Sequence, residues 1–177
     1  MKNRIAPSVL LAMGFLFVCA SHAAAQQTEQ KKTRTPSEAI LLNWNDVGNR
    51  LITMAEDWPE DKYSYRPNDQ VRTFAKNLLH VAGSNFGLVN QIRGQKVGDE
   101  DNDPSPDKYK TKAQVVDFLK KSVAEGAATI QKEGDAGVLK HLDLWDGYTE
   151  HMGEHYGQLV VYYRNNGVIP PESRPKK

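Results

Sequence analysis

Apolar residues recur along this chain with the spacing of α-helices. Four segments place them three and four residues apart, so each segment would carry one apolar stripe. These segments cover about residues 37–55, 72–92, 112–131 and 144–165, and a short turn at 138–142 precedes the last. No segment shows the period-two alternation or the hairpin dipeptides of a sheet. Four such helices can bury their stripes against one another, so the pattern predicts an all-α fold, a four-helix bundle.

Turn-forming residues separate the predicted helices. Ser37 is the expected N-cap of the first helix. The glycine-containing run "KEGDAG" at 132–137 is expected to end the third helix. Between the second and third helices lies a long acidic, proline-containing segment, "GQKVGDEDNDPSPDKYKT", at 94–111. Loops of this length are uncommon in compact domains, and they often span a bundle end or carry function.

The first 25 residues have the three parts of an export signal. Two basic residues precede an apolar stretch at 5–18, and small residues then predict cleavage before Gln26. The apolar stretch is too short for a typical membrane span. We therefore expect a protein that is periplasmic or secreted, with no stable membrane span after cleavage. Cys19 follows Val18 rather than glycine or alanine, which disfavours a lipid anchor.

Removal of the signal peptide (1–25) leaves a polar segment without periodicity at 26–36, which is expected to be a disordered tether. Residues 37–177 then form the predicted bundle. The one cysteine of the chain lies in the signal, so the mature protein has no disulfide and no thiol nucleophile. The chain carries 23 basic and 22 acidic residues, and a near-neutral chain without a basic run disfavours nucleic acid as a partner.

Two histidines, His151 and His155, lie four residues apart on the last predicted helix. At about 100° per residue, His151 lies within about 40° of His155. Residues of the apolar stripe lie in the same sector: Leu144, Tyr148, Leu159 and Tyr162. Burying two imidazoles is costly unless both find partners. One divalent metal ion would satisfy both, and this spacing is used in helical metal sites.

The alternative is a pair of core histidines bonded to backbone, tyrosine or water. A metal ion would need a further ligand, and outside the signal peptide the chain offers two more histidines, His80 and His141. His141 lies in the irregular segment before the last helix and is expected to face solvent. His80 lies within a predicted helix, so the helix backbone would hold its side chain in a defined position.

Periodicity alone does not decide the role of His80. The apolar face of its helix is centred near Ala82, away from His80, which favours a histidine on the polar face. Alternatively, Gly83, Ser84 and Gly87 leave space beside His80 for a metal ion or a ligand cavity.

The segment "HMGEH" also matches the H-x-x-E-H pattern of one class of zinc proteases. That class needs a further carboxylate ligand well downstream. Here the residues after His155 include one acidic residue, Glu172, in a proline-rich tail. Glu154 is also rotated by about 100° from the direction of His155. We interpret the match as fortuitous.

Three stretches resemble the DinB-like superfamily of bacterial metal-binding helical bundles. They are "AEDWPEDKYSYRP", "LLHVAGSNFGLVNQIRG" around His80, and "HMGEHYGQLVVYYRNNGVIPPESRP". The resemblance covers nearly all of residues 37–175, and its C-terminal stretch is the most specific part. It implies a bundle with up-down-down-up topology, which needs a long crossover, and residues 94–111 are the candidate segment.

The resemblance also implies a metal site of three histidines, one on the second helix and an H-x3-H pair on the last. These positions match His80, His151 and His155. Zinc is the favoured ion, and nickel or iron would also accept imidazole ligands. Three neutral nitrogens leave an open coordination position, as in catalytic zinc sites.

The resemblance leaves the reaction class and the substrate open. The first hypothesis is an exported metal-dependent hydrolase acting on a small molecule, with Tyr148, Tyr162 or Glu154 assisting. The second is a non-catalytic module that binds a metal ion or a small ligand. A thiol-dependent transferase or isomerase, as in some relatives, is a third, although export away from cytosolic thiols disfavours it. A homodimer is compatible with the sequence, which does not determine the oligomeric state.

Overall fold

The computed structural model describes residues 33–98 and 101–176. The predicted signal peptide at 1–25 and the tether as far as residue 32 lie outside these described residues. From Arg34 onward the chain forms one compact unit. Within the described ranges no strand occurs, and none of the helices there combines the length and apolar character that crossing a membrane requires.

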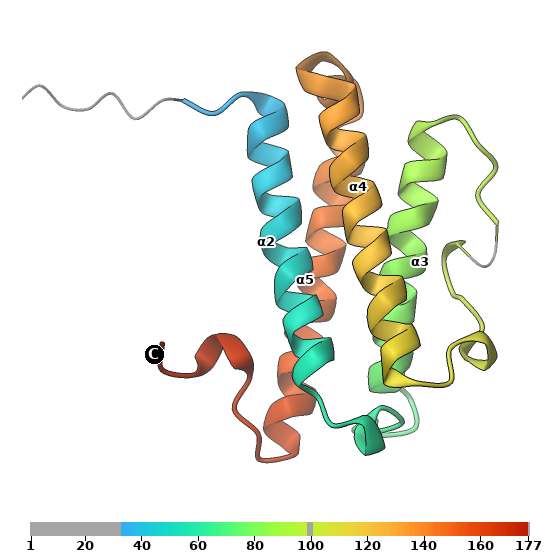
Figure 1. Ribbon diagram of the computed structural model, residues 1–177, viewed down its shortest axis with the longest axis vertical. Coiled ribbons are helices and arrows are strands. Elements are labelled where there is room, and N and C mark those ends of the chain that lie inside the picture. The colour runs from blue at the N-terminus through green and yellow to red at the C-terminus, as the bar shows by residue number, and fades with distance from the viewer. Residues whose placement is uncertain (1–32, 99–100, 177) are drawn as a thin grey trace, which may run out of the picture. The chain divides into compact units, whose positions relative to one another are not determined.

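Four long helices make up the bundle (Figure 1). They are α2 (Pro36–Asp57), α3 (Phe74–Ile92), α4 (Lys112–Lys140) and α5 (Leu142–Asn165). Short 3-10 helices that lie wholly within the described residues occur in the connections and the tail: η1 (Glu60–Lys62), η3 (Pro106–Lys108) and η4 (Pro171–Ser173). The predicted all-α four-helix bundle is confirmed for the described part of the chain.

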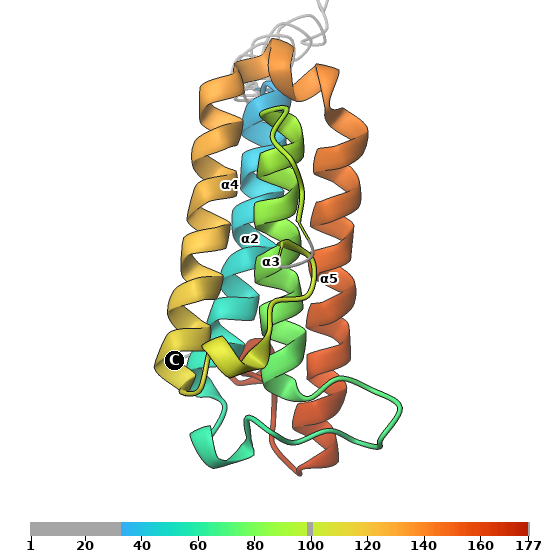
Figure 2. The same cartoon turned by 90° about the vertical axis from the view of Figure 1, so that its right-hand side faces the viewer.

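The order of the helices is up-down-down-up. Both α2 and α3 pack mainly against α4 and α5, so α2 and α3 lie on one diagonal of the bundle. Figures 1 and 2 show α3 and α4 running in the same direction, with α2 and α5 running the opposite way. The segment between α3 and α4 returns along the outside of α3. Its described residues, 93–98 and 101–111, include all of the predicted crossover, 94–111, except residues 99 and 100.

The first helix begins two residues earlier than predicted. Its N-cap is Thr35 and not Ser37, because Thr35 and Glu38 form a reciprocal capping box. Pro36 occupies the first helical position, where a missing N–H costs nothing. Ser37 instead donates through its backbone N–H and its hydroxyl to Asp135, at 3.0 and 2.6 Å. The last residues of the predicted tether therefore belong to the folded unit.

The run "KEGDAG" interrupts the third helix without ending it. Gly134 has φ 60° and ψ −168°, a conformation that side chains other than hydrogen rarely tolerate. Helical geometry resumes after Gly134 and continues to Lys140, and α5 begins at Leu142. The predicted turn at 138–142 is thus mostly the last turn of α4.

Helix α3 is buried on nearly all sides. Thirteen of its 19 residues are buried, because the crossover covers the face that the other helices leave open. A Cβ atom on Gly83 would lie 2.7 Å from Pro104 Cδ, and one on Gly87 would lie 3.1 Å from the backbone oxygen of Asp101. These glycines therefore accommodate the crossover. The expected space is therefore filled at Gly83 and Gly87, whereas Ser84 lines a cavity beside the histidines.

Aromatic contacts hold the helices at both ends of the bundle. Trp44 on α2 and Trp145 on α5 meet edge to face, with ring centroids 5.5 Å apart. Trp58, directly after α2, stacks on Phe74 of α3 at 4.8 Å and lies 4.5 Å from the ring of Tyr163 on α5. Large buried rings contribute strongly to packing. Through Trp58, the second set of contacts joins α3 to α5, the two helices that carry the histidines.

Candidate metal centre

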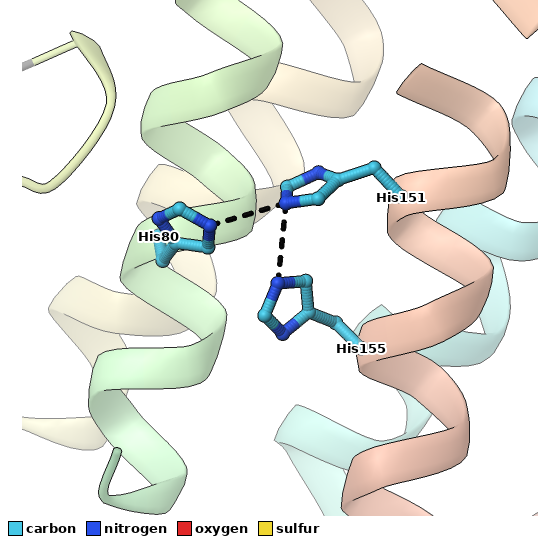
Figure 3. Close-up of side chains that lie close together, drawn as sticks. All are labelled: His80, His151 and His155. Carbon is cyan, nitrogen blue, oxygen red and sulfur yellow. Dashed lines mark hydrogen bonds between the residues drawn. The ribbon is translucent and has the colours of Figure 1, made fainter. Parts of the chain in front are cut away.

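The three histidines singled out in the sequence lie together between α3 and α5 (Figure 3). His151 Nε2 is 3.1 Å from His80 Nε2 and 3.1 Å from His155 Nε2. All three ligand atoms lie within 4.8 Å of one another. The i,i+4 spacing places His151 and His155 on successive turns of α5, so both rings face His80 on α3.

The tautomer of His80 is set by the crossover. Its Nδ1 lies 2.7 Å from the backbone carbonyl oxygen of Asn102. A carbonyl oxygen can only accept a hydrogen bond, so Nδ1 carries the proton and donates. In the neutral ring Nε2 is then unprotonated, and its lone pair points toward the other two histidines. The crossover thus orients a ring whose role periodicity left undecided.

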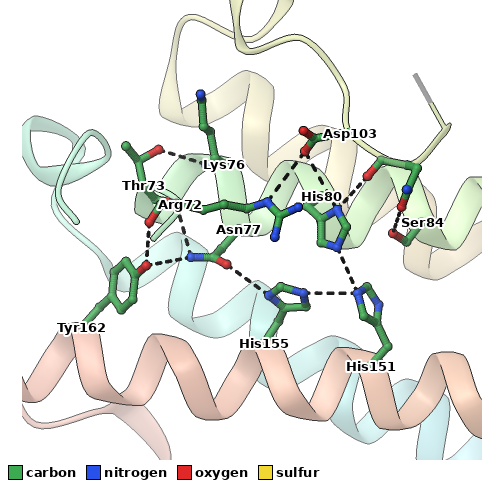
Figure 4. A network of polar contacts seen from close by, with 11 residues as sticks. Arg72, Thr73, Lys76, Asn77, His80, Ser84, Asp103, His151, His155 and Tyr162 are labelled. Carbon is green, nitrogen blue, oxygen red and sulfur yellow. Dashed lines mark hydrogen bonds and ion pairs between the residues drawn. The ribbon is translucent and has the colours of Figure 1, made fainter. Parts of the chain in front are cut away.

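A chain of hydrogen bonds sets the tautomer of His155 in the same way (Figure 4). The hydroxyl of Tyr162 donates to the backbone oxygen of Arg72 at 2.5 Å, and it accepts from Asn77 Nδ2 at 3.1 Å. The amide oxygen of Asn77 therefore faces His155 and accepts from its Nδ1 at 3.1 Å. This leaves Nε2 of His155 unprotonated as well. Supporting bonds of this kind orient metal-ligating histidines.

The environment of His151 fits a metal ion better than hydrogen bonding alone. Its Nε2 faces two nitrogens that both present lone pairs, and one proton can serve only one of them well. Its Nδ1 is buried and has no hydrogen-bond partner among the described residues. A tetrahedral ion with Zn–N distances of 2.0–2.1 Å places ligand nitrogens about 3.3–3.4 Å apart. Two of the three separations, at 3.1 Å, are close to that value, and the third lies within 4.8 Å.

Burial keeps the three rings neutral. Desolvation is the main reason that the pKa of His80 and that of His151 lie below the ordinary value of 6.5. For His155, burial first, and then the neighbouring His151 and His80, lower the pKa to about 3. Neutral imidazole is the form that ligates a metal ion. The cluster is therefore in the ligating form at neutral pH.

One edge of the cluster opens into a cavity of about 320 Å³. His151 lines it together with six other residues: Ser84, Asn102, Asp143, Leu144, Gly147 and Tyr148. The ring of Tyr148 lies 6.2 Å from that of His151. This volume is at the small end of the range for ligand pockets. An ion held by the three nitrogens would thus be within reach of a small molecule.

The three residues suggested to assist catalysis, Tyr148, Tyr162 and Glu154, lie in different environments. Tyr148 lines the cavity, whereas Tyr162 supports Asn77 behind His155. Glu154 is exposed, while His155 is buried on the inner face of the same helix. The third potential ligand of the cluster is His80, whereas the zinc proteases with H-x-x-E-H use a downstream carboxylate. This agrees with the interpretation of "HMGEH" as fortuitous.

His141 stands apart from the cluster, but it does not face solvent freely as expected. Its side chain is 19% exposed, and its Nδ1 lies 2.9 Å from Glu133 Oε1. Trp145 Nε1 donates to the other oxygen of Glu133 at 3.2 Å. The continuation of α4 past Gly134 brings His141 back over Glu133, and this contact is the reason that His141 is partly buried. His141 joins α4 to α5.

Two supporting groups escaped the sequence analysis. Asn77 is a polar residue in the apolar run "FAKNLLH", three residues before His80, and this break in the pattern is a detectable signal. The group that Asn102 contributes is a backbone carbonyl. Every residue has one, so the side-chain pattern contains no signal for it.

Comparison with known proteins agrees with this geometry. The family model described as the DinB superfamily matches residues 43–162, a range that contains His80, His151 and His155. Neither the search of curated proteins nor the search of solved structures found a match. On the strength of the family match, which spans more than half of the chain, the protein belongs to the DinB superfamily.

Proposed function

We propose that this protein binds one divalent metal ion through the Nε2 atoms of His80, His151 and His155. The observation that carries the proposal is the convergence of these three nitrogens, two of them with tautomers set for ligation by Asn102 and Asn77. Zinc suits three imidazoles and tetrahedral geometry, and nickel and iron also accept imidazole.

Metal analysis of single variants tests the ligand set. Replacing His80, His151 or His155 with alanine removes one of three protein ligands. We expect zinc affinity to fall by more than about 100-fold, beyond the 10–100-fold typical of losing a supporting residue. His141→Ala is the matched control and should bind zinc like the parent. The ligand set is wrong if His80→Ala retains parental affinity while its circular dichroism shows a folded helical protein.

We further propose that the site catalyses hydrolysis of a small molecule. Three protein ligands leave a coordination position open. When bound, such an ion polarises a substrate oxygen and lowers the pKa of water. The cavity beside His151 gives a substrate room, and Asp143 and Tyr148 are among its lining residues. In this proposal, the carboxyl group of Asp143 and the hydroxyl of Tyr148 orient the substrate and exchange protons with it.

Activity screening separates hydrolysis from the two alternatives. The zinc-loaded parent and His151→Ala should be compared on ester, amide, phosphoester and thiol substrates. Hydrolysis by the parent and its loss in the variant would support the proposal. Turnover of thiol substrates alone would favour a transferase. Zinc binding without turnover of any of them would favour a non-catalytic metal-binding module.

We also propose export of the protein, on the basis of the tripartite signal at 1–25. These residues lie outside the described part of the chain, so the proposal depends on the sequence. Intact-mass measurement of protein from a periplasmic extract should give a chain starting near Gln26. A soluble cytosolic protein that retains residues 1–25 would overturn it.

A further inference from the structure

A positively charged side chain lies beside the histidine cluster. Arg72 lies two residues before α3, and its Nε is 3.8 Å from Asp103 Oδ1; the same oxygen lies 3.9 Å from His80 Nδ1 (Figure 4). Its backbone oxygen accepts from Tyr162, so the residue is anchored to the bonds that orient His155. Its guanidinium and the ring of His80 therefore flank one carboxylate.

The guanidinium of Arg72 is poorly neutralised. A separation of 3.8 Å is too long for a hydrogen bond, and the side chain of Asp103 is 68% exposed. Among the described residues, the guanidinium has no other polar contact. Its charge reaches the cluster, since it acts to lower the pKa of His80, His151 and His155. A cation so placed would repel a divalent ion. A bound anion would offset both charges.

Arg72 also lines a second cavity, of about 650 Å³. Its polar wall includes Asn77, Gln158 and Tyr162, and Asn77 is the residue that holds His155. Its other wall is apolar: Val71 and Val161 line it and are 39% and 51% exposed. The cavity thus combines one cation with an exposed aliphatic surface.

We propose that Arg72 binds the carboxylate of an amphipathic substrate whose apolar part packs on Val71 and Val161. The inference deepens the proposed function and rests on it for the reacting centre. The second cavity shares no lining residue with the cavity beside His151, so the substrate would extend from the metal ion past Arg72 and leave its apolar part on Val71 and Val161. The planar fork of arginine matches a carboxylate with two parallel hydrogen bonds. The substrate carboxylate forms the close ion pair with Arg72 that Asp103, at 3.8 Å, does not form. Arg72 is thereby a specificity-determining residue that selects anionic over neutral substrates.

Binding of simple probes tests this assignment. Hexanoate and the neutral hexanamide should be titrated calorimetrically into the zinc-loaded protein. We expect hexanoate to bind at least about 10-fold more tightly than hexanamide, and Arg72→Gln to abolish that preference. Arg66→Gln is the matched control, because Arg66 lies in the same connection with similar exposure, 44% against 43%, but pairs with Asp69 at 2.7 Å. This control should keep the preference.

A second variant tests the apolar wall without touching Arg72. Val161→Asp places a negative charge on an exposed helix position, and hexanoate binding should weaken about 10-fold while zinc content stays unchanged. Equal hexanoate affinity in the parent and Arg72→Gln would overturn the proposal. Tighter binding of inorganic phosphate than of hexanoate would overturn the carboxylate assignment.

Zinc content measured on each sample separates this inference from the proposed function. If the parent holds no zinc, the metal proposal fails. The ratio of hexanoate affinities between the parent and Arg72→Gln is then measured on the metal-free protein. A ratio near one overturns the role of Arg72, and a ratio of about 10 or more supports it.

Discussion

At the scale of single residues, the histidine cluster depends on groups that are not themselves potential metal ligands. Asn77 illustrates this dependence: its amide links the hydroxyl of Tyr162 to Nδ1 of His155. Because the Tyr162 hydroxyl is committed to the Arg72 carbonyl, the amide of Asn77 has one favourable orientation. That orientation in turn determines which nitrogen of His155 is free to ligate.

Replacing Asn77 with alanine should weaken zinc binding by about 10–100-fold, because His155 loses the acceptor that fixes its tautomer. Competition with a chelator of known affinity measures the change. Asn85→Ala is the control, since Asn85 is also buried on α3 but bonds Ser122 and Met152. It should lower stability and leave zinc affinity as in the parent. Equal zinc affinity in Asn77→Ala and the parent would exclude this role.

At the scale of elements, the crossover is part of the site. It covers α3 and brings the Asn102 carbonyl to His80, and it can do so because Gly83 lets Pro104 approach closely. A long connection of this kind is needed because α3 and α4 run in the same direction. The connection that the topology requires thus also orients a candidate ligand.

Gly83→Ala should therefore affect both stability and the site. The added methyl group would lie 2.7 Å from Pro104 Cδ, and a proline ring cannot move aside as a flexible side chain does. We expect a loss of about 1–3 kcal/mol in the free energy of unfolding, as for other overpacked positions, with weaker zinc binding as Asn102 shifts.

Denaturant unfolding and chelator competition measure the two effects of Gly83→Ala. Gly157→Ala is the control, because Gly157 is exposed on α5 with no atom within 4 Å of the added methyl group. It should stabilise the protein by up to about 1 kcal/mol through higher helix propensity. A Gly83→Ala protein as stable as the parent would contradict the close packing of the crossover.

At the scale of the whole molecule, the C-terminal tail ties back to the end of α2. The carboxylate of Asp57 accepts from Arg174 at 2.8 and 2.6 Å and from the hydroxyl of Tyr163 at 3.1 Å. The hydrogen bond from the Arg174 guanidinium is the main reason that the pKa of Asp57 lies below its ordinary 3.8. The folded state therefore favours the ionised carboxyl group.

The Asp57 contact should make stability depend on pH. Because its pKa is lower in the folded than in the unfolded chain, its contribution is fully present above pH 3.8 and is lost as pH falls below that value. At pH 7, Asp57→Asn should lower the thermal midpoint by roughly 2–4 °C. The difference from the parent should shrink toward pH 3 in calorimetric scans. A difference that stays constant from pH 7 to pH 3 would contradict the ion pair.

Local patterns were sufficient to predict the helices and the paired histidines. Helical periodicity is a property of neighbouring residues, so the four helices and the inward direction of His151 and His155 followed from spacing alone. Helix ends were less well predicted, because Pro36 favours an earlier start and Gly134 permits α4 to continue beyond a break. The resemblance to a family supplied the topology and the matching of His80.

Tertiary structure decided the surroundings of His80, the path of the crossover and the position of Arg72. His80 lies off the apolar stripe of its own helix, and it is buried because the crossover covers that face at residues 101–104. The contact that orients it comes from a backbone carbonyl 22 residues away. Helical spacing encodes only which residues share a face. Which segment later covers that face depends on contacts between residues distant in the chain, and these exist only in the folded bundle.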